Sequence, residues 1–258
     1  MTALTQTWSM TGRHVRAFIR QPWFVAVSLV QPVIWLLLFG ALFKSVTSIP
    51  GFGGTASYLD YLVPAVLVMT ALFSCGWSGM GIIEDLDRGI MDRFLVSPVH
   101  RGAIITGRTL YEMLALLVQA LVIGGLALLL GARFAGGLLG FLVLVACAML
   151  IGAAFASFSD AMALRIRQRE SVIGVNTMLV LPLTFLSAAF MPLALVPDWI
   201  ATVARFNPVN WAVEAGRAAM VGGPDWSFVL PRVAGLLVVT GLAMWWATGT
   251  FRAYQRSI

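Results

Sequence analysis

Six long apolar segments dominate this chain and constrain its fold more than any other feature. They lie near residues 23–43, 61–83, 112–130, 138–158, 172–190 and 233–250. A helix needs about 20 apolar residues to cross the hydrocarbon core of a bilayer. Only 11% of the residues are charged, whereas soluble domains carry about 25%. We therefore predict an all-α integral membrane protein with six transmembrane helices, and we exclude a water-soluble globule.

Basic side chains predict the orientation of these helices, because cytoplasmic loops collect Lys and Arg. Six spans place both termini on one side, which then carries twelve of the 17 basic residues. These are Arg13, Arg16, Arg20, Arg88, Arg93, Arg101, Arg108, Arg165, Arg167, Arg169, Arg252 and Arg256, against Lys44, Arg133, Arg205, Arg217 and Arg232 on the other side. We expect both termini in the cytoplasm, residues 159–171 in a cytoplasmic loop, and the chain in the cell membrane.

Groups that could carry out chemistry are scarce in this sequence. Topology and contact with anionic lipid account for the formal charge of +6, so no nucleic-acid partner is expected. Lys44 is the only lysine, and it follows an apolar run instead of the glycine-rich turn of a phosphate loop. His14 and His100 lie in separate segments. Cys75 and Cys147 lie inside apolar runs, so we predict no metal, no cofactor and no catalytic residue on this chain.

Residues 1–21 precede the first apolar segment and have a helical pattern. Stepping about 100° per residue places Leu4 and Phe18 on one arc and Arg16 and Arg20 on the opposite arc. This pattern predicts an amphipathic helix lying in the membrane interface. The alternative is a charged flank of the first span with no regular structure of its own.

The most charged stretch of the chain, EDLDRGIMDRFLVSPVHR, covers residues 84–101. Its apolar residues recur at helical spacing, and Glu84, Arg88 and Asp92 alternate in sign four residues apart. Pro98 ends the pattern, because proline disfavours helical geometry in the residue before it. We predict a short amphipathic helix on the cytoplasmic face. The alternative is a solvated loop with paired charges.

Residues 191–231 are too polar to cross a membrane and too apolar to stand free in water. We predict two short helices there, near residues 197–206 and 209–220, which dip into the outer leaflet. Asn207 and Pro208 suit a helix start, with the asparagine as cap and the proline in the first turn.

The second of these outer helices carries Trp211, Glu214 and Arg217. The two charged residues are three positions apart, a spacing that allows an ion pair on one helix. Tryptophans are enriched at membrane interfaces, so Trp211 is expected to anchor the helix there. Tryptophans that line a path for a sugar are the alternative.

Polar groups inside the apolar segments are expected to have a specific reason to be there. They are Gln31, Glu112, Gln119 and Asn176. A charge at the bilayer centre costs about 2.5–3.5 kcal/mol, and Glu112 follows Arg108 by one helical turn. We expect either an ion pair of Glu112 with Arg108 or a role of Glu112 at a gate. The three amides either join helices by hydrogen bonds or line a substrate path.

Three segments together resemble the membrane permeases of type-2 ATP-binding-cassette exporters. Residues 84–101 resemble the coupling helix of that family. The segment LPLTFLSAAFMPLALVPDWI, residues 181–200, resembles its fifth span with the outer helix that follows. FNPVNWAVEAGRAAM, residues 206–220, resembles the Asn-Pro segment before its last span. The likeness covers essentially the whole chain.

This resemblance implies one transmembrane domain over residues 1–258, paired with a second copy or a close paralogue. Two separate ATPase subunits would then bind ATP and Mg²⁺ and drive export of an amphiphilic drug-like or lipid-linked substrate. The coupling residues implied by the resemblance are Glu84, Asp85, Asp87, Arg88, Asp92, Arg93 and Arg101. Their ionic contacts would transmit closure of the ATPases to the second and third spans.

Two other functions are compatible with the composition. One is a secondary transporter driven by an ion gradient, for which Glu112 would be the coupling carboxylate. A single acid near the interface and the lack of an evident inverted repeat argue against it. The other is a membrane scaffold subunit that transports nothing, and only the family resemblance argues against that function.

Overall fold

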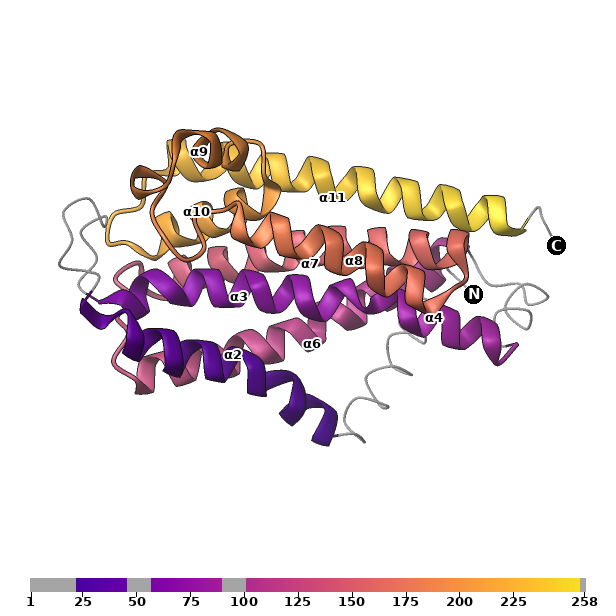
Figure 1. Cartoon of the computed structure of the whole chain (residues 1–258), viewed down its shortest axis with the longest axis horizontal. Coiled ribbons are helices and arrows are strands. Elements are labelled where there is room, and N and C mark those ends of the chain that lie inside the picture. The colour runs from indigo at the N-terminus through magenta and orange to yellow at the C-terminus, as the bar shows by residue number, and fades with distance from the viewer. Residues whose placement is uncertain (1–21, 46–56, 90–100, 256–258) are drawn as a thin grey trace.

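A computed structural model describes residues 22–45, 57–89 and 101–255, with side chains from 27–45, 57–89 and 107–254 (Figure 1). Every regular element in these ranges is a helix, which confirms the all-α class. The long helices are α2 (Pro22–Leu42), α3 (Tyr58–Gly76), α6 (Arg101–Leu129), α7 (Gly137–Ile166), α8 (Arg169–Phe185) and α11 (Trp226–Gln255). Shorter elements are α4 (Ser78–Asp87), η2 (Leu193–Leu195), α9 (Asp198–Ala204) and α10 (Pro208–Met220).

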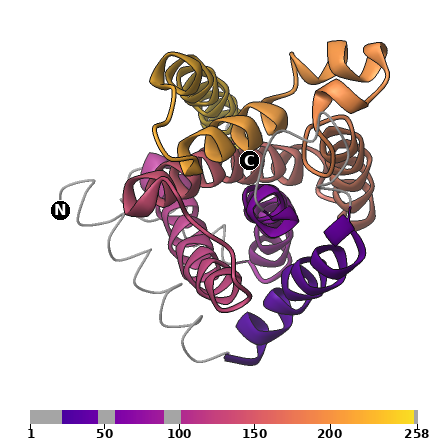
Figure 2. The same cartoon turned by 90° about the vertical axis from the view of Figure 1, so that its left-hand side faces the viewer.

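The long helices lie side by side along one axis, with α3 surrounded by the others in the end-on view (Figures 1 and 2). Every residue from 61 to 72 in α3 is buried. Helix α7 contacts α3, α4, α6, α8, α10 and α11. The main core joins these helices through fully buried side chains such as Leu72, Leu116, Ile151 and Leu236.

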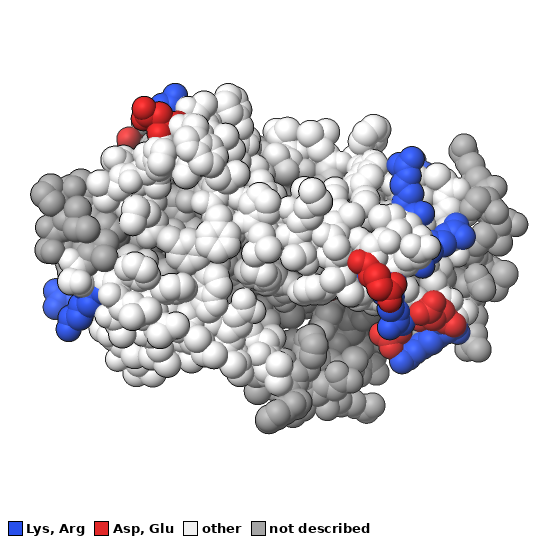
Figure 3. Space-filling view, viewed as in Figure 1, with Lys and Arg blue, Asp and Glu red and all other residues white. Residues whose placement is uncertain are grey.

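Four helical stretches in the described residues are long and apolar enough to cross a membrane. They are Tyr58–Asp87, Gly107–Leu129, Gly137–Ile166 and Trp226–Tyr254. The stretch in α11 exposes Val238, Leu242 and Trp245 on one face, with Trp245 76% exposed. A face of this kind is stable against lipid or a partner protein and not against water, because contiguous apolar surface of this extent is costly in water. The middle of the molecule in Figure 3 correspondingly shows no charged side chains, which gather at the two ends. The chain is a multi-pass membrane protein.

Several helices extend beyond the apolar segments that predicted them. Helix α6 begins at Arg101, α7 continues to Ile166, and α11 begins at Trp226 and includes Pro231. Hydropathy marks only the part of a helix that lies in hydrocarbon. Backbone hydrogen bonding continues past that part into polar sequence, and the helix ends where capping or a turn stops it.

The start of α11 shows such a cap. The carboxylate of Asp225 accepts hydrogen bonds from the Ser227 backbone N–H (3.0 Å) and hydroxyl (2.6 Å). These bonds stabilise the ionised carboxylate and hold the pKa of Asp225 below its ordinary value.

The predicted separate helix does not begin at residue 84. Residues 84–87 instead form the last part of α4. The helix ends because Gly89 adopts a left-handed conformation (φ 64°), which favours glycine. The backbone N–H groups of Arg88 and Gly89 donate to the carbonyls of Glu84 and Leu86, each at 3.0 Å. Leu86 packs against the buried cluster around Ile83, which holds this end of α4 on the bundle. The predicted interfacial helix 1–21 lies outside the described residues, as do Asp92, Arg93 and the side chain of Arg101.

At the opposite end, α10 packs closely against the start of α7. The backbone N–H of Gly136 donates to the carbonyl of Met220 at 2.7 Å. A Cβ at Gly136 or Gly140 would overlap the carbonyl of Ala219. The approach of these two backbones therefore requires glycine in α7 and just before it.

Candidate functional site

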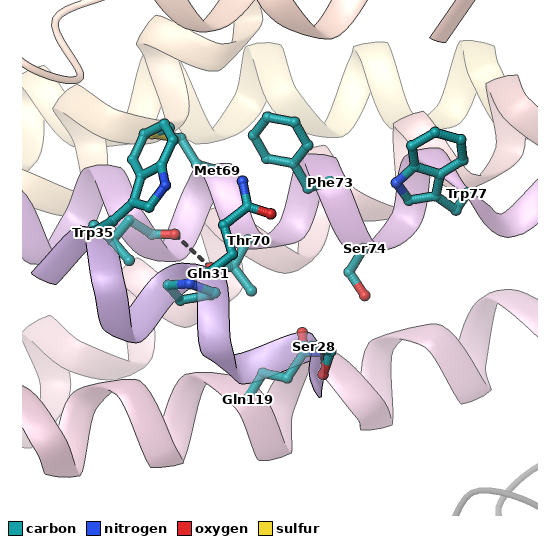
Figure 4. Close-up of a pocket in the computed structure, with 11 residues that line it drawn as sticks. Ser28, Gln31, Trp35, Met69, Thr70, Phe73, Ser74, Trp77 and Gln119 are labelled. Atoms are coloured by element: carbon teal, nitrogen blue, oxygen red, sulfur yellow. Dashed lines mark hydrogen bonds between the residues drawn. The ribbon is translucent and has the colours of Figure 1, made fainter. Parts of the chain in front are cut away.

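A pocket of about 300 Å³ lies among α2, α3 and α6 (Figure 4). It is lined by Ser28, Gln31, Pro32, Trp35, Val66, Met69, Thr70, Phe73, Ser74, Trp77 and Gln119. In Figure 4 the rings of Trp35, Phe73 and Trp77 lie along one side, and Ser28 and Gln119 lie on the other. The lining contains no charged residue, so the pocket suits a ligand with an apolar or aromatic body and few polar groups.

Gln119, which lines this pocket, carries a buried acceptor without a partner among the described residues. The amide nitrogen of Gln119 donates to the hydroxyl of Ser28 at 3.0 Å, and the residue is only 3% exposed. Its amide oxygen has no hydrogen-bond partner among the described residues. Leaving a buried acceptor unpaired costs about 1–3 kcal/mol. A ligand that donates a hydrogen bond to this oxygen would recover that free energy, provided that the Gln119 side chain turns the buried oxygen toward the pocket.

Helical periodicity explains which residues reach the pocket. Ser28, Gln31 and Trp35 are three and four positions apart and share one face of α2. Sequence reasoning selected Gln31 and Gln119 because they are polar, and the structure brings both to this pocket. It missed the aromatic residues, because aromatic side chains in spans are common in cores and facing lipid. Trp35 follows Gln31 by four positions in α2, and this helical spacing is the signal that could have found it.

A second polar site surrounds the break between α3 and α4 at Trp77. The carbonyl of Gly76 accepts hydrogen bonds from the Ser159 hydroxyl (2.6 Å) and the Asn176 amide (2.5 Å). The Gly79 N–H donates to the Ser159 hydroxyl at 3.1 Å. Helices α7 and α8 thus supply partners for backbone groups that the interrupted helix leaves without intrahelical bonds.

Arg108 of α6 is at the centre of this site. Its guanidinium donates to the Ser78 carbonyl at 2.6 Å and the Ser78 hydroxyl at 3.2 Å. It lies 3.7 Å from carboxylate oxygens of both Asp85 and Asp160. Asp160 is 1% exposed and also accepts from the Ser78 hydroxyl at 2.9 Å. The contacts join α4, α6 and α7 through one buried ionic cluster, here called the Arg108 cluster (Ser78, Asp85, Arg108, Asp160).

The Arg108 cluster corrects two predictions. Arg108 forms its salt bridges with Asp85 and Asp160, whereas its predicted pairing with Glu112 is an electrostatic attraction without a salt bridge. Asp160 belongs to the buried part of α7 and not to a cytoplasmic loop. A buried carboxylate requires a cation, and Arg108 is the one that reaches it. Glu112 is close enough to Arg108, Asp160 and Ser78 to interact with them. Glu112 and Asn176 therefore border this site, whereas Gln31 and Gln119 line the pocket.

Helix α10 is fixed by its own polar contacts at the other end. Asn207 caps the helix by accepting from the Val209 N–H at 2.9 Å, and Pro208 occupies the first turn, as predicted. The Asn207 amide also donates to the carbonyls of Leu183 and Leu186 at 2.7 and 2.8 Å. These bonds tie the start of α10 to the end of α8.

The predicted pairing of Glu214 with Arg217 is wrong. Glu214 forms a salt bridge with Arg232 of α11 at 2.8 Å. The Arg217 guanidinium lies 3.5 Å above the Tyr61 ring and donates to the carbonyls of Tyr61 (3.1 Å) and Ala188 (3.0 Å). Both charged residues therefore fasten α10 to neighbouring segments instead of to each other.

In the same region the indole N–H of Trp211 donates a hydrogen bond to the Arg205 carbonyl at 2.7 Å.

Among the described residues, no group of three His, Cys, Asp or Glu side chains lies close enough to hold a metal ion.

Comparison with known proteins adds to this geometry. The profile of the family described as ABC-2 type transporter matches residues 5–221. The chain is 28% identical to the daunorubicin resistance ABC transporter permease protein DrrB1 of Streptomyces coeruleorubidus, over 98% of this chain and 87% of that protein.

Two further relatives are also described as permeases. The probable doxorubicin resistance ABC transporter permease protein DrrC of Mycobacterium tuberculosis is 27% identical, over 98% of this chain and 90% of its own length. The putative transport permease ycf38 of Cyanophora paradoxa is 30% identical, over 76% of this chain and 67% of its own length. With a profile match over most of its length and apolar helices of membrane-spanning size, this chain belongs to the ABC-2 type transporter family.

Proposed function

We propose that this chain, a membrane permease subunit of an ABC exporter, moves an amphiphilic substrate out of the cytoplasm or the inner leaflet. It works as a dimer of permeases with two separate ATPase subunits, which bind ATP and Mg²⁺. The observation that carries this proposal is the uncharged, aromatic pocket with the unpartnered oxygen of Gln119. Family membership supports the division of labour between permease and ATPase.

The chain crosses the membrane six times in this proposal, with α2 and α8 as spans beside the four long apolar stretches. The end of the bundle that carries the last residues of α4 and α11 faces the cytoplasm. Twelve of the 17 basic residues lie in segments on the side of the two termini. Cytoplasmic loops collect Lys and Arg, so this excess supports the orientation. Helices α9 and α10 then lie in the outer leaflet, where Trp211 anchors the interface and Glu214 and Arg217 hold α10 in place.

The last turn of α4 and the residues that follow contact the ATPase. Glu84, Asp87 and Arg88 are exposed there, and Asp85 reaches inward to Arg108. Asp92, Arg93 and Arg101 complete the proposed contact. A displacement of this segment by the ATPase would pull on the Arg108 cluster and so on α6 and α7. Coupling of this kind shifts an equilibrium between two arrangements of the helices.

An uncharged planar amphiphile with a hydrogen-bond donor is the substrate class that the pocket favours. Trp35 and Phe73 offer faces for stacking, and Gln119 offers the acceptor. The names of two relatives refer to daunorubicin and doxorubicin, which makes daunorubicin the first probe to use.

Pocket variants test this assignment in the complex of the chain with its ATPase. Stimulation of ATP turnover by daunorubicin is measured against drug concentration. Loss of one hydrogen bond in Gln119→Leu should raise the half-maximal concentration by roughly fivefold. Phe73→Ala should raise it by roughly tenfold through lost stacking.

Matched controls are available elsewhere in the chain. Gln168→Leu alters an exposed amide and Phe206→Ala alters a phenylalanine that is 78% exposed, so neither should shift the concentration dependence. Equal effects of Phe73→Ala and Phe206→Ala would contradict the pocket assignment. Turnover that ignores daunorubicin but rises with a lipid-linked glycan would contradict the drug-like substrate class.

A further inference from the structure

A groove of about 800 Å³ lies between the end of α7 and the last turns of α11 and shares no lining residue with the pocket or the Arg108 cluster. It is lined by Leu164, Arg165, Arg167, Met244, Trp245, Trp246, Thr248, Gly249, Thr250, Arg252, Ala253 and Tyr254. Three of these residues are arginines and none is acidic. We propose that this groove binds the phosphate-bearing headgroup of an anionic phospholipid.

The positive charge of the groove is not neutralised within the described part of the chain. Arg165, Arg167 and Arg252 are exposed and form no salt bridge there. Their neighbours at the same end behave differently, because Arg169 pairs with Asp87 at 2.8 Å and Arg88 pairs with Glu84. Arginine presents several donors in a planar fork that matches phosphate oxygens. The groove therefore gathers three arginines that, among the described residues, form no salt bridge and can meet an anion.

One of these arginines is held in place before any ligand arrives. Arg167 ends α7 in a left-handed conformation (φ 57°), which is uncommon for a residue other than glycine. Its guanidinium lies 4.6 Å from the centre of the Tyr254 ring of α11. This contact joins the two helices that form the groove and limits the conformational freedom that a ligand would have to remove.

The other half of the groove is suited to the apolar part of a lipid. Trp245 is 76% exposed and Trp246 packs on Phe158 with ring centroids 5.5 Å apart. Val238, Leu242 and Trp245 continue from the groove along one exposed face of α11. Acyl chains can therefore follow α11 into the membrane while the headgroup meets the arginines. Free phosphate would use only the polar half, and this difference favours a lipid.

The proposal is tested by titrating lipids into the permease, purified with its ATPase in a non-ionic detergent, and counting bound lipid by native mass spectrometry. Phosphatidylglycerol should bind at saturable stoichiometry and phosphatidylcholine should not. In Arg165→Gln/Arg252→Gln the dissociation constant for phosphatidylglycerol should rise roughly 25-fold, taking about fivefold for each arginine that meets an anionic headgroup. Arg167 is left unchanged because it also terminates α7.

The matched control is Arg133→Gln/Arg205→Gln, which removes two exposed arginines from the opposite end of the molecule. It should leave the dissociation constant unchanged. An equal loss in both double variants would overturn the proposal, because general surface charge would then explain the binding. Inorganic phosphate that displaces phosphatidylglycerol at equal concentration would overturn the assignment to a lipid. Neither result depends on transport activity, so a failure of this proposal can be distinguished from a failure of the proposed function.

Discussion

Arg108 and Arg217 show how single residues hold this membrane domain together. Each is a cation whose neighbours come from distant parts of the sequence. Arg217 reaches carbonyls of residues 61 and 188, whereas Arg108 reaches Asp160 and Ser78. Buried charges are stable only when they are paired and hydrogen-bonded, so these contacts fix how the helices are arranged.

The pairing of Arg108 with Asp160 should appear in a double-mutant cycle. Asp160→Asn alone leaves a buried arginine with less compensation and should lower the free energy of unfolding by about 3 kcal/mol. Adding Arg108→Gln should recover part of that loss, with a coupling energy of about 1–3 kcal/mol. Thermal unfolding of the purified variants in detergent gives the values. Additive losses in the double variant would show that the two side chains do not interact.

Sequence reasoning worked for residues whose partners are local. Asn207 was identified as a cap because its partner is two positions away. The partners of Arg108 and Glu214 are 52 and 18 positions away, and no pattern in one sequence indicates which distant helix faces which. Sequence spacing therefore favours the i, i+3 and i, i+4 neighbours, and in both cases the salt bridge is with a partner on another helix.

At the scale of elements, close contact between α7 and α10 depends on residues without side chains. Gly136 and Gly140 allow the carbonyl of Ala219 to approach the backbone of this segment. Small residues at helix contacts have the same purpose in other membrane proteins. Hydropathy identified the apolar core of α7 but not this contact, because backbone approach leaves no mark on hydropathy. The Asn207–Pro208 signal, in contrast, predicts α10 near residues 209–220, close to the observed Pro208–Met220.

Gly140→Ala should disturb that contact. The added Cβ would overlap the Ala219 carbonyl, which is backbone and cannot rotate away. We expect a loss of about 1–3 kcal/mol, typical of overpacking, and a lower midpoint of thermal unfolding in detergent. The control is Gly125→Ala in α6, where a Cβ would meet nothing within 4 Å. Its midpoint should stay the same or rise, and an equal fall in both variants would contradict the contact.

At the scale of the whole molecule, the charged side chains on the face shown in Figure 3 lie at two ends separated by an apolar middle. One end holds the last turn of α4 beside the Arg108 cluster, and the other holds α9 and α10. The pocket of Gln119 lies between α2, α3 and α6, and no charged residue lines it. A substrate site inside the membrane and a partner contact at one end are the parts that an ATP-driven permease requires.

The central claim is that ATP hydrolysis by a separate subunit drives transport through this chain. Its most direct test reconstitutes the permease with its ATPase in liposomes and follows the movement of daunorubicin after addition of ATP. The account predicts transport that vanadate abolishes and that ionophores, which collapse ion gradients, leave unchanged. Transport that continues in vanadate and stops with the ionophores would contradict it and would identify a secondary transporter.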